Sequence, residues 1–263
     1  MSIMNRHSFL EKHSGPLIAG ILVTVAIGGL VEIAPLFYVE NTIEEVDGVR
    51  PYTPLELAGR EVYIKEGCYS CHSQMVRPLR DEVERYGHYS LAAESMFDHP
   101  FQWGSKRTGP DLARVGGKYS DDWHREHLIN PSNLVPGTVM PKYAHLDQVP
   151  VNFERIAAKM AANRRVGVPY TDEQIENAVS DLRLQGGSPL TEDYEGFEAR
   201  WEGVAVPDMP DDEFISEMDA LIAYLQVLGT MVDFSTFEIE QEAPPPLRQV
   251  ENEGEPSTGT SGG

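Results

Sequence analysis

The longest apolar stretch of the chain lies near its N-terminus. Leu17 to Val39 reads LIAGILVTVAIGGLVEIAPLFYV, with one charged side chain, Glu32. About 20 apolar residues are enough for a helix to cross a bilayer. A secretory signal peptide would have a shorter apolar region followed by a small-x-small cleavage site, and no good site follows here. The pattern predicts an uncleaved transmembrane anchor within residues 1–40.

Charges around this apolar stretch predict its orientation and surroundings. Arg6 and Lys12 precede it, and basic residues favour the cytoplasmic side of a membrane. We therefore expect a cytoplasmic N-terminus, with everything after residue 40 exported. Glu32 can reach the interface from a helix end, but a carboxylate in an apolar span more often faces protein than lipid. Gly28 and Gly29 would permit close helix approach, so the anchor is typical of one that belongs to a complex.

Beyond a polar linker at 41–54, apolar positions recur with the period of α-helices. We expect helices at 55–66, 80–97, 121–129, 153–165, 172–182 and 212–228. Ser120 is a predicted N-cap, and Thr171 with Gln174 a predicted capping box. No strand-like alternation of any length occurs. The sequence predicts an all-α domain at 55–237 and a disordered acidic, Pro/Gly-rich tail at 238–263.

The charge balance narrows the classes of partner. The net charge is −21 at pH 7, which argues against a nucleic-acid partner. It fits a solvated acidic surface or a basic protein partner.

The candidate chemistry lies in EGCYSCHSQM, residues 66–75. Cys68 and Cys71 are the only cysteines, and His72 follows them directly. A zinc site would need more Cys or His ligands than one such pair offers, and a thioredoxin-like pair would follow a strand. Cys-x-x-Cys-His is the attachment motif of a c-type haem. The motif therefore predicts one covalent haem c, with thioether bonds to both cysteines and His72 as proximal iron ligand.

A second axial ligand must come from elsewhere in the chain. Met96, Met160 and Met218 fall on predicted helices, where methionine is more often core. Met140 lies instead in NPSNLVPGTVMPKY, a loop stiffened by three prolines. We expect Met140 to be the distal ligand, while His127 and His145 stay open as alternatives.

The order of these motifs resembles a class I cytochrome c. That family has a helix, CxxCH, a Gly-Pro-x-Leu turn, a helix ending in Asn-Pro, a Pro-Gly-Thr-x-Met loop and a final helix. This chain has TGPDL at 108–112, Asn-Pro at 130–131 and PGTVM at 136–140. The resemblance implies that the Pro110 carbonyl accepts the His72 N–H, and that Thr138 and Tyr119 donate to haem propionates. It also implies contact between the first helix, near Gly59 and Tyr63, and the last.

Two departures from a minimal cytochrome c make the resemblance more specific. Residues 73–107 and 142–211 are large insertions. Together with the anchor and the stretches GLVEIAPLF, GCYSCHSQMVRPLRDEVERYG and QWGSKRTGPDLARVGGKYSDDWHREHLINP, they resemble the mono-haem subunit II of cbb3-type cytochrome c oxidases. The expected fold is thus all-α, with one transmembrane helix followed by a class I cytochrome c domain carrying two insertions.

The resemblance implies an electron relay in a bacterial inner membrane, with the haem domain in the periplasm. Electrons would come from a di-haem cytochrome c subunit III or a soluble cytochrome c. They would pass to the haem–copper catalytic subunit I, which reduces O₂ and pumps protons; the chain itself would have no oxygen-reducing site. Two further hypotheses are a free-standing membrane-anchored shuttle and a haem-based sensor.

A group of basic residues stands out within the first insertion. Arg77, Arg80, Lys106 and Arg107 accompany Trp103 there. In so acidic a chain, we hypothesise that they contact subunit I or neutralise propionates.

Overall fold

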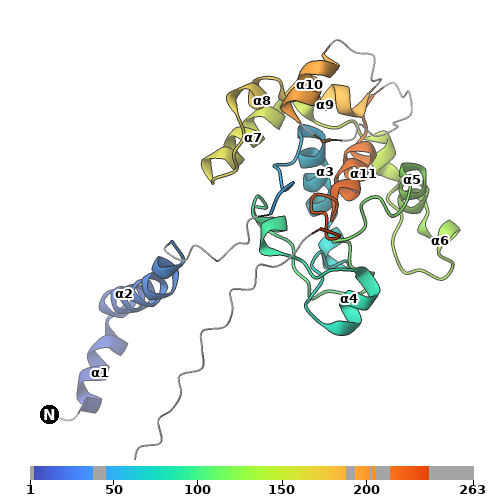
Figure 1. Cartoon of the computed structure of the whole chain (residues 1–263). Helices are drawn as coiled ribbons and strands as arrows, with labels where there is room; N and C mark the ends of the chain where they lie inside the picture. Colours follow the sequence, from blue (N-terminus) through green and yellow to red (C-terminus); the bar gives the residue numbers. More distant parts are fainter. Residues whose placement is uncertain (1–2, 38–45, 188–192, 202, 205–213, 237–263) are drawn as a thin grey trace, which may run out of the picture. The chain divides into compact units, whose positions relative to one another are not determined.

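The computed structural model of the chain describes residues 3–37, 46–187, 193–201, 203–204 and 214–236. Within these ranges every regular element is a helix, and no strand occurs (Figure 1). The all-α prediction is confirmed for this part of the chain. The predicted tail at 238–263, much of the linker and the predicted start of the last helix at 212 lie outside the described residues.

The N-terminal segment consists of helices. α1 (Ile3–Lys12) and α2 (Ser14–Ile33) lead into the 3₁₀ turn η1 (Ala34–Phe37). By length and composition, Ser14–Leu36 could cross a membrane. None of α2 is buried against protein, and so large an exposed apolar surface is typical of a lipid or partner contact. The predicted span is thus present, with a start slightly earlier than Leu17.

Two helices from opposite ends of the main domain form its centre. α3 (Pro54–Lys65) and α11 (Glu217–Val227) lie side by side in Figure 1. At their crossing, a Cβ on Gly59 would lie 1.8 Å from the Ala220 carbonyl oxygen, so only glycine allows this approach. Tyr63 and Tyr224 pack with ring centroids 5.5 Å apart. The predicted contact between the first and last helices is confirmed.

Reciprocal caps fix where these two helices begin. The Thr53 hydroxyl accepts the Glu56 N–H, and the Glu56 carboxylate accepts the Thr53 N–H. Ser216 and Asp219 form the same capping box at the start of α11. Each cap satisfies amide groups that a helix start leaves without partners. Because Thr53 is fully buried, the C-terminal end of the predicted linker belongs to the core.

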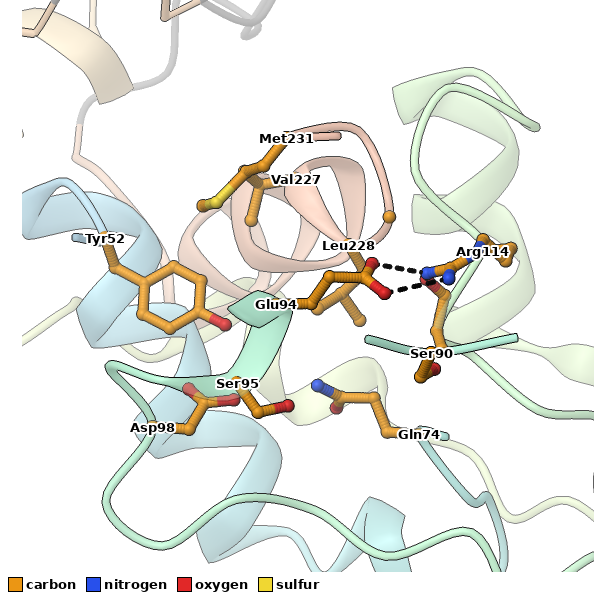
Figure 2. Close-up of a pocket in the computed structure, with 12 residues that line it drawn as sticks. Tyr52, Gln74, Ser90, Glu94, Ser95, Asp98, Arg114, Val227, Leu228 and Met231 are labelled. Atoms are coloured by element: carbon orange, nitrogen blue, oxygen red, sulfur yellow. Dashed lines mark hydrogen bonds and ion pairs between the residues drawn. The ribbon is translucent and has the colours of Figure 1, made fainter. Parts of the chain in front are cut away.

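The first insertion packs against the end of α11. It contains α4 (Arg80–Tyr86) and the 3₁₀ turn η4 (Ala92–Ser95), where a single helix at 80–97 was predicted. Figure 2 shows Glu94 of this turn paired with both terminal nitrogens of Arg114, at 2.6 and 2.9 Å. Beside them lies a cavity of about 40 Å³, large enough for little more than water.

The helix before Asn130 forms as predicted. α5 (Asp121–Ile129) begins at Ser120, whose hydroxyl accepts the Trp123 N–H. The chain bends at Asn130, but Pro131 then opens a further short helix, α6 (Pro131–Leu134). Proline suits a first helical position because its missing N–H would have no partner there.

The second insertion is a small helical layer. It runs through η5 (Ala144–Gln148), η6 (Phe153–Arg155), α7 (Ile156–Arg165), α8 (Asp172–Glu176), α9 (Ala178–Gly186) and α10 (Tyr194–Arg200). The predicted capping box at Thr171 is confirmed, but the helix after it breaks at Asn177. α10 was not predicted. The Tyr170 hydroxyl donates to the Tyr52 carbonyl at 2.8 Å, which ties this layer to the start of α3.

We predict that Gly59→Ala destabilises the domain by about 1–3 kcal/mol, since the added methyl must push α11 away from α3. The measurement is urea unfolding of the purified protein. An unchanged unfolding midpoint would show that the α3–α11 crossing is looser than the 1.8 Å approach implies.

Candidate functional site: a cavity behind the CxxCH motif

A cavity of about 530 Å³ lies between α3, α5, α11 and the 135–143 loop. Its size is that of a site for a small organic molecule or cofactor. Its wall includes Cys68, Cys71, His72, Pro110, Tyr119, Thr138 and Met140. All seven residues that the sequence singled out therefore border one cavity, although they are spread over more than 70 positions.

The cysteine motif forms a compact turn at the end of α3. The 3₁₀ turn η3 (Cys68–Ser70) is closed by hydrogen bonds from the Cys71 and His72 amides to the Cys68 carbonyl, at 3.1 and 2.9 Å. Both cysteines are free thiols. Burial, and then the nearby Glu66 carboxylate, raises the pKa of Cys68 to about 12. Cys68 is thus a neutral thiol at the wall of the cavity.

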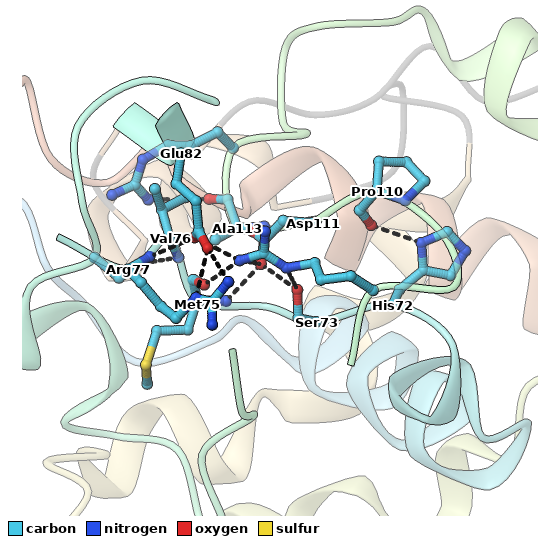
Figure 3. Close-up of polar contacts among 12 residues, drawn as sticks. His72, Ser73, Met75, Val76, Arg77, Glu82, Pro110, Asp111 and Ala113 are labelled. Carbon is cyan, nitrogen blue, oxygen red and sulfur yellow. Dashed lines mark hydrogen bonds and ion pairs between the residues drawn. The ribbon is translucent and has the colours of Figure 1, made fainter. Parts of the chain in front are cut away.

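The ring of His72 is held in one orientation. Its Nδ1 lies 2.8 Å from the Pro110 carbonyl oxygen, the hydrogen bond expected from the Gly-Pro turn (Figure 3). The ring packs directly against the backbone of Gly109, since a Cβ on that residue would lie 2.2 Å from the His72 Cε1. With Nδ1 bonded to a carbonyl, Nε2 is the nitrogen left to bind a metal.

The segment around His72 pairs with the Gly-Pro turn through the backbone. The Gly109 amide donates to the Cys71 carbonyl and the Leu112 amide to the Ser73 carbonyl, each at 2.9 Å. His72 and Arg107 form an isolated antiparallel bridge between these two segments. The pairing brings the CxxCH motif and TGPDL together.

A buried polar network continues from this pairing into the first insertion. Asp111 accepts hydrogen bonds from the Ser73 hydroxyl at 2.6 Å and from two backbone amides. Arg107 pairs with Glu82 at 2.6 Å and also donates to the Ser73 hydroxyl. Glu82 accepts from Arg77 as well. Burial raises the pKa of Glu82, but its hydrogen bonds from Arg77 and Arg107 outweigh burial and hold that pKa at about 2.

This network bears on one part of the hypothesis for the basic residues of the insertion, because none of the four borders the cavity where propionates would lie. Their contact with subunit I stays a prediction. Arg77 and Arg107 both pair with the buried Glu82; the Arg77 side chain is half exposed, and that of Arg107 is mostly buried. Arg80 forms an exposed pair with Glu84. Trp103 is 68% exposed beside Phe101, so it offers an apolar surface to a partner.

The loop that carries Met140 is tied at both ends. The Val135 amide donates to the Pro131 carbonyl, and the Tyr143 amide to the Leu128 carbonyl, at 2.9 and 2.8 Å. Inside the loop, the Met140 amide donates to the Thr138 hydroxyl oxygen at 3.2 Å. That hydroxyl keeps its proton free to donate elsewhere. Met140 is half-buried and packs against the core.

An aromatic wall that was not predicted completes the cavity. Tyr119 stacks on Trp123 with centroids 3.9 Å apart, and Trp123 stacks on His127 at 4.7 Å. These rings and His124 all border the cavity. Their spacing along α5, at 123, 124 and 127, was the available signal, since positions three and four apart share one helix face.

Two histidine nitrogens in this wall are buried without a hydrogen-bond partner, Nε2 of His124 and Nδ1 of His127. Burial, and then the neighbouring His127, lowers the pKa of His124 to about 4. Burial, and then the charge of His72, also lowers the pKa of His127. His145, the other histidine considered as a ligand, is absent from the cavity wall and lies 3.3 Å from Glu66.

These surroundings fit a haem. Two thiols, an imidazole nitrogen and a thioether border the same cavity, and they are the groups by which proteins hold haem c. Leu112, Leu128, Val135, Leu221 and Leu225 give it apolar walls. The unpartnered nitrogens of His124 and His127 are the kind of buried polar atom that a bound group satisfies.

A single apolar N-terminal helix and a helical domain around such a cavity define a cofactor-binding protein with a candidate membrane anchor. The chain belongs to the family described as cytochrome C oxidase, mono-heme subunit/FixO, whose sequence model matches residues 7–232. It is therefore a haem-containing subunit of an oxidase complex. No curated protein matches the chain. Membership of an oxidase family leaves the shuttle and sensor hypotheses without support.

The low pKa of Glu82 predicts how stability depends on pH. Its pKa falls from 4.5 to about 2 on folding, so its contribution is full above pH 4.5 and is lost as pH falls through 2. Glu82→Gln should cost about 1–3 kcal/mol at pH 7 and reduce the loss of stability between pH 4.5 and 2. Urea unfolding across this range measures both effects.

Glu84→Gln is the matched control, because Glu84 lies on the same helix in an exposed pair worth about 0.3–0.5 kcal/mol. Equal losses in the two variants would contradict a special contribution from Glu82.

Proposed function

We propose that this chain is the electron-relay subunit of a cbb3-type cytochrome c oxidase. In this proposal Cys68 and Cys71 bind one haem c covalently, and His72 and Met140 are its axial ligands. Pro110 orients His72, while Thr138 and Tyr119 contact the propionates. The observation that carries the proposal is the convergence of these seven residues on one cavity in a chain of the mono-heme oxidase subunit family.

The bound group supplies a reversible one-electron Fe(III)/Fe(II) couple. The protein's residues decide how it is used. The hydrogen bond from His72 Nδ1 to the Pro110 carbonyl fixes the orientation of the ring. It also makes the imidazole a stronger donor to a metal. A methionine ligand raises the reduction potential above that of two histidines. Because His72 and Met140 would both bind the iron, they would leave no position for O₂, and the subunit would pass electrons on to the subunit that reduces oxygen.

The partners and the location follow from the same proposal. Electrons enter from a di-haem cytochrome c subunit III or a soluble cytochrome c and leave to the haem–copper subunit I. The span Ser14–Leu36, preceded by Arg6 and Lys12, supports a cytoplasmic N-terminus and a periplasmic haem domain in a bacterial inner membrane.

The axial ligand pair is tested with Met140→Ala. The protein extracted from membranes should gain the mass of one covalent haem. Its ferric form should show the far-red charge-transfer band that marks a thioether–iron bond. Met140→Ala should keep the covalent haem, lose this band and lower the potential.

Met96→Ala is the control, because Met96 is exposed on the first insertion and should leave the band intact. If Met140→Ala retains the band, another methionine is the ligand. If the variant is low-spin without the band, His127→Phe in that background shows whether His127, which borders the cavity, has taken its place. Absence of covalent haem would overturn the proposal.

Assembly into an oxidase is tested by purification through a tag placed after residue 263. We expect a haem–copper subunit with many spans to co-purify in a fixed ratio, with cytochrome c oxidase activity. Glu32→Leu should leave the haem spectrum unchanged and weaken this association if the carboxylate faces a partner helix. A haem-loaded chain that purifies alone from gently solubilised membranes would favour a free-standing shuttle.

A further inference from the structure

The carbonyl that orients His72 is itself held on both sides. On its N-terminal side, the Gly109 amide donates to the Cys71 carbonyl at 2.9 Å. On its C-terminal side, Asp111 turns its carboxylate back onto the segment that follows His72. The residues on either side of Pro110 are therefore both hydrogen-bonded to the segment that contains His72. The Pro110 carbonyl oxygen, which lies between them, has little freedom to move.

The Asp111 carboxylate is the stronger of these ties. Its side chain has no exposed surface. Oδ2 accepts from the Ser73 hydroxyl at 2.6 Å and from the Met75 amide at 3.0 Å, while Oδ1 accepts from the Ala113 amide at 2.8 Å. Hydrogen bonds to a buried carboxylate are among the strongest in proteins. Both oxygens are thus used to fix the turn relative to residues 73–75.

This tie continues into the first insertion through one guanidinium. Arg107 lies 3.5 Å from Asp111 and donates to the Met75 carbonyl at 3.1 Å and to Glu82 at 2.6 Å. Glu82, at the start of α4, is 5% exposed. Arg107 therefore contacts both carboxylates, and Figure 3 shows Glu82 and Asp111 lying together beside Ser73. Arg107 and Glu82 of the first insertion thus belong to the same polar network as Asp111, which holds the turn at 108–112 in place.

We infer that Asp111 is a positioning residue, which sets the His72–Pro110 hydrogen bond and, through Arg107 and Glu82, joins that bond to the insertion. The inference rests on the proposed function, because the hydrogen bond matters through the iron that His72 would bind. A weaker bond at Nδ1 makes the imidazole a poorer donor, so loosening the centre should raise the reduction potential. Arg107 and Glu82 would then influence the potential although neither borders the cavity.

The test compares Asp111→Asn and Ser73→Ala in the intact, haem-loaded oxidase complex. Asp111→Asn removes a charge and an acceptor oxygen, while Ser73→Ala keeps the charge and removes the two hydrogen bonds that the Ser73 hydroxyl makes with Asp111 and Arg107. Two quantities are measured: the reduction potential, and the exchange with solvent of the His72 Nδ1 proton, seen by NMR in the diamagnetic ferrous state. We expect both variants to raise the potential. We also expect proton exchange roughly two- to tenfold faster, the range for one lost hydrogen bond.

The second readout separates positioning from simple charge. A raised potential in Asp111→Asn with unchanged proton exchange, and no effect of Ser73→Ala, would mean that only the charge matters and would overturn the inference. Glu82→Gln should act in the same direction as Ser73→Ala if the insertion is joined to the bond, whereas Glu84→Gln, on the exposed face of α4, should change neither quantity.

Failure of the inference is distinguishable from failure of the proposed function. If every variant carries covalent haem with the thioether–iron band but the same potential and exchange rate, the function stands and the positioning role is wrong. If the unaltered chain carries no covalent haem, the function fails first. Unfolding midpoints of all variants, measured alongside, show whether a change in potential reflects general loss of structure.

Discussion

The structure depends on the pairing of the segment after the CxxCH motif with the turn at 108–112. Backbone bonds from Gly109 and Leu112 and the buried carboxylate of Asp111 hold the two segments together. This pairing places the His72 ring against Gly109 and within reach of the Pro110 carbonyl. A buried carboxylate without such partners would cost several kcal/mol, so the network is stable only when all of its members are in place.

The α3–α11 crossing supplies the second constraint. Because Gly59 lets the two helices approach closely, α3 ends where η3 can present both cysteines to the cavity. Leu221 and Leu225 of α11 form the apolar floor of the same cavity. The loop with Met140 and the helix α5 close the remaining sides. Chain segments far apart in sequence thus meet at one cavity because two local contacts fix the frame.

Local signals predicted much of this arrangement. Caps at Ser120 and Thr171 and the CxxCH motif depend on a few neighbouring residues, so the sequence reveals them. The break at Asn177 and the helix α10 depend on packing in the second insertion, which periodicity does not record. The partner of Arg107 was also out of reach of the sequence. Its direct neighbours, Lys106 and Thr108, give no sign of the pairing with Glu82, which is 25 positions away and buried. Only the tertiary structure shows that this arginine pairs with a buried carboxylate within its own domain.

The aromatic wall shows a cost that the protein chain alone does not offset. His124 and His127 bury nitrogen atoms without partners, and the pKa of each is lowered mainly by burial. Unsatisfied buried polar atoms beside a cavity of about 530 Å³ reduce the stability of the free chain. A cofactor with an apolar body would fill the cavity, and its polar edges would reach the two histidine nitrogens. Such a group binds the folded chain far better than the unfolded chain, and therefore stabilises the fold. The residues that weaken the domain by themselves are therefore those that favour a tightly held cofactor.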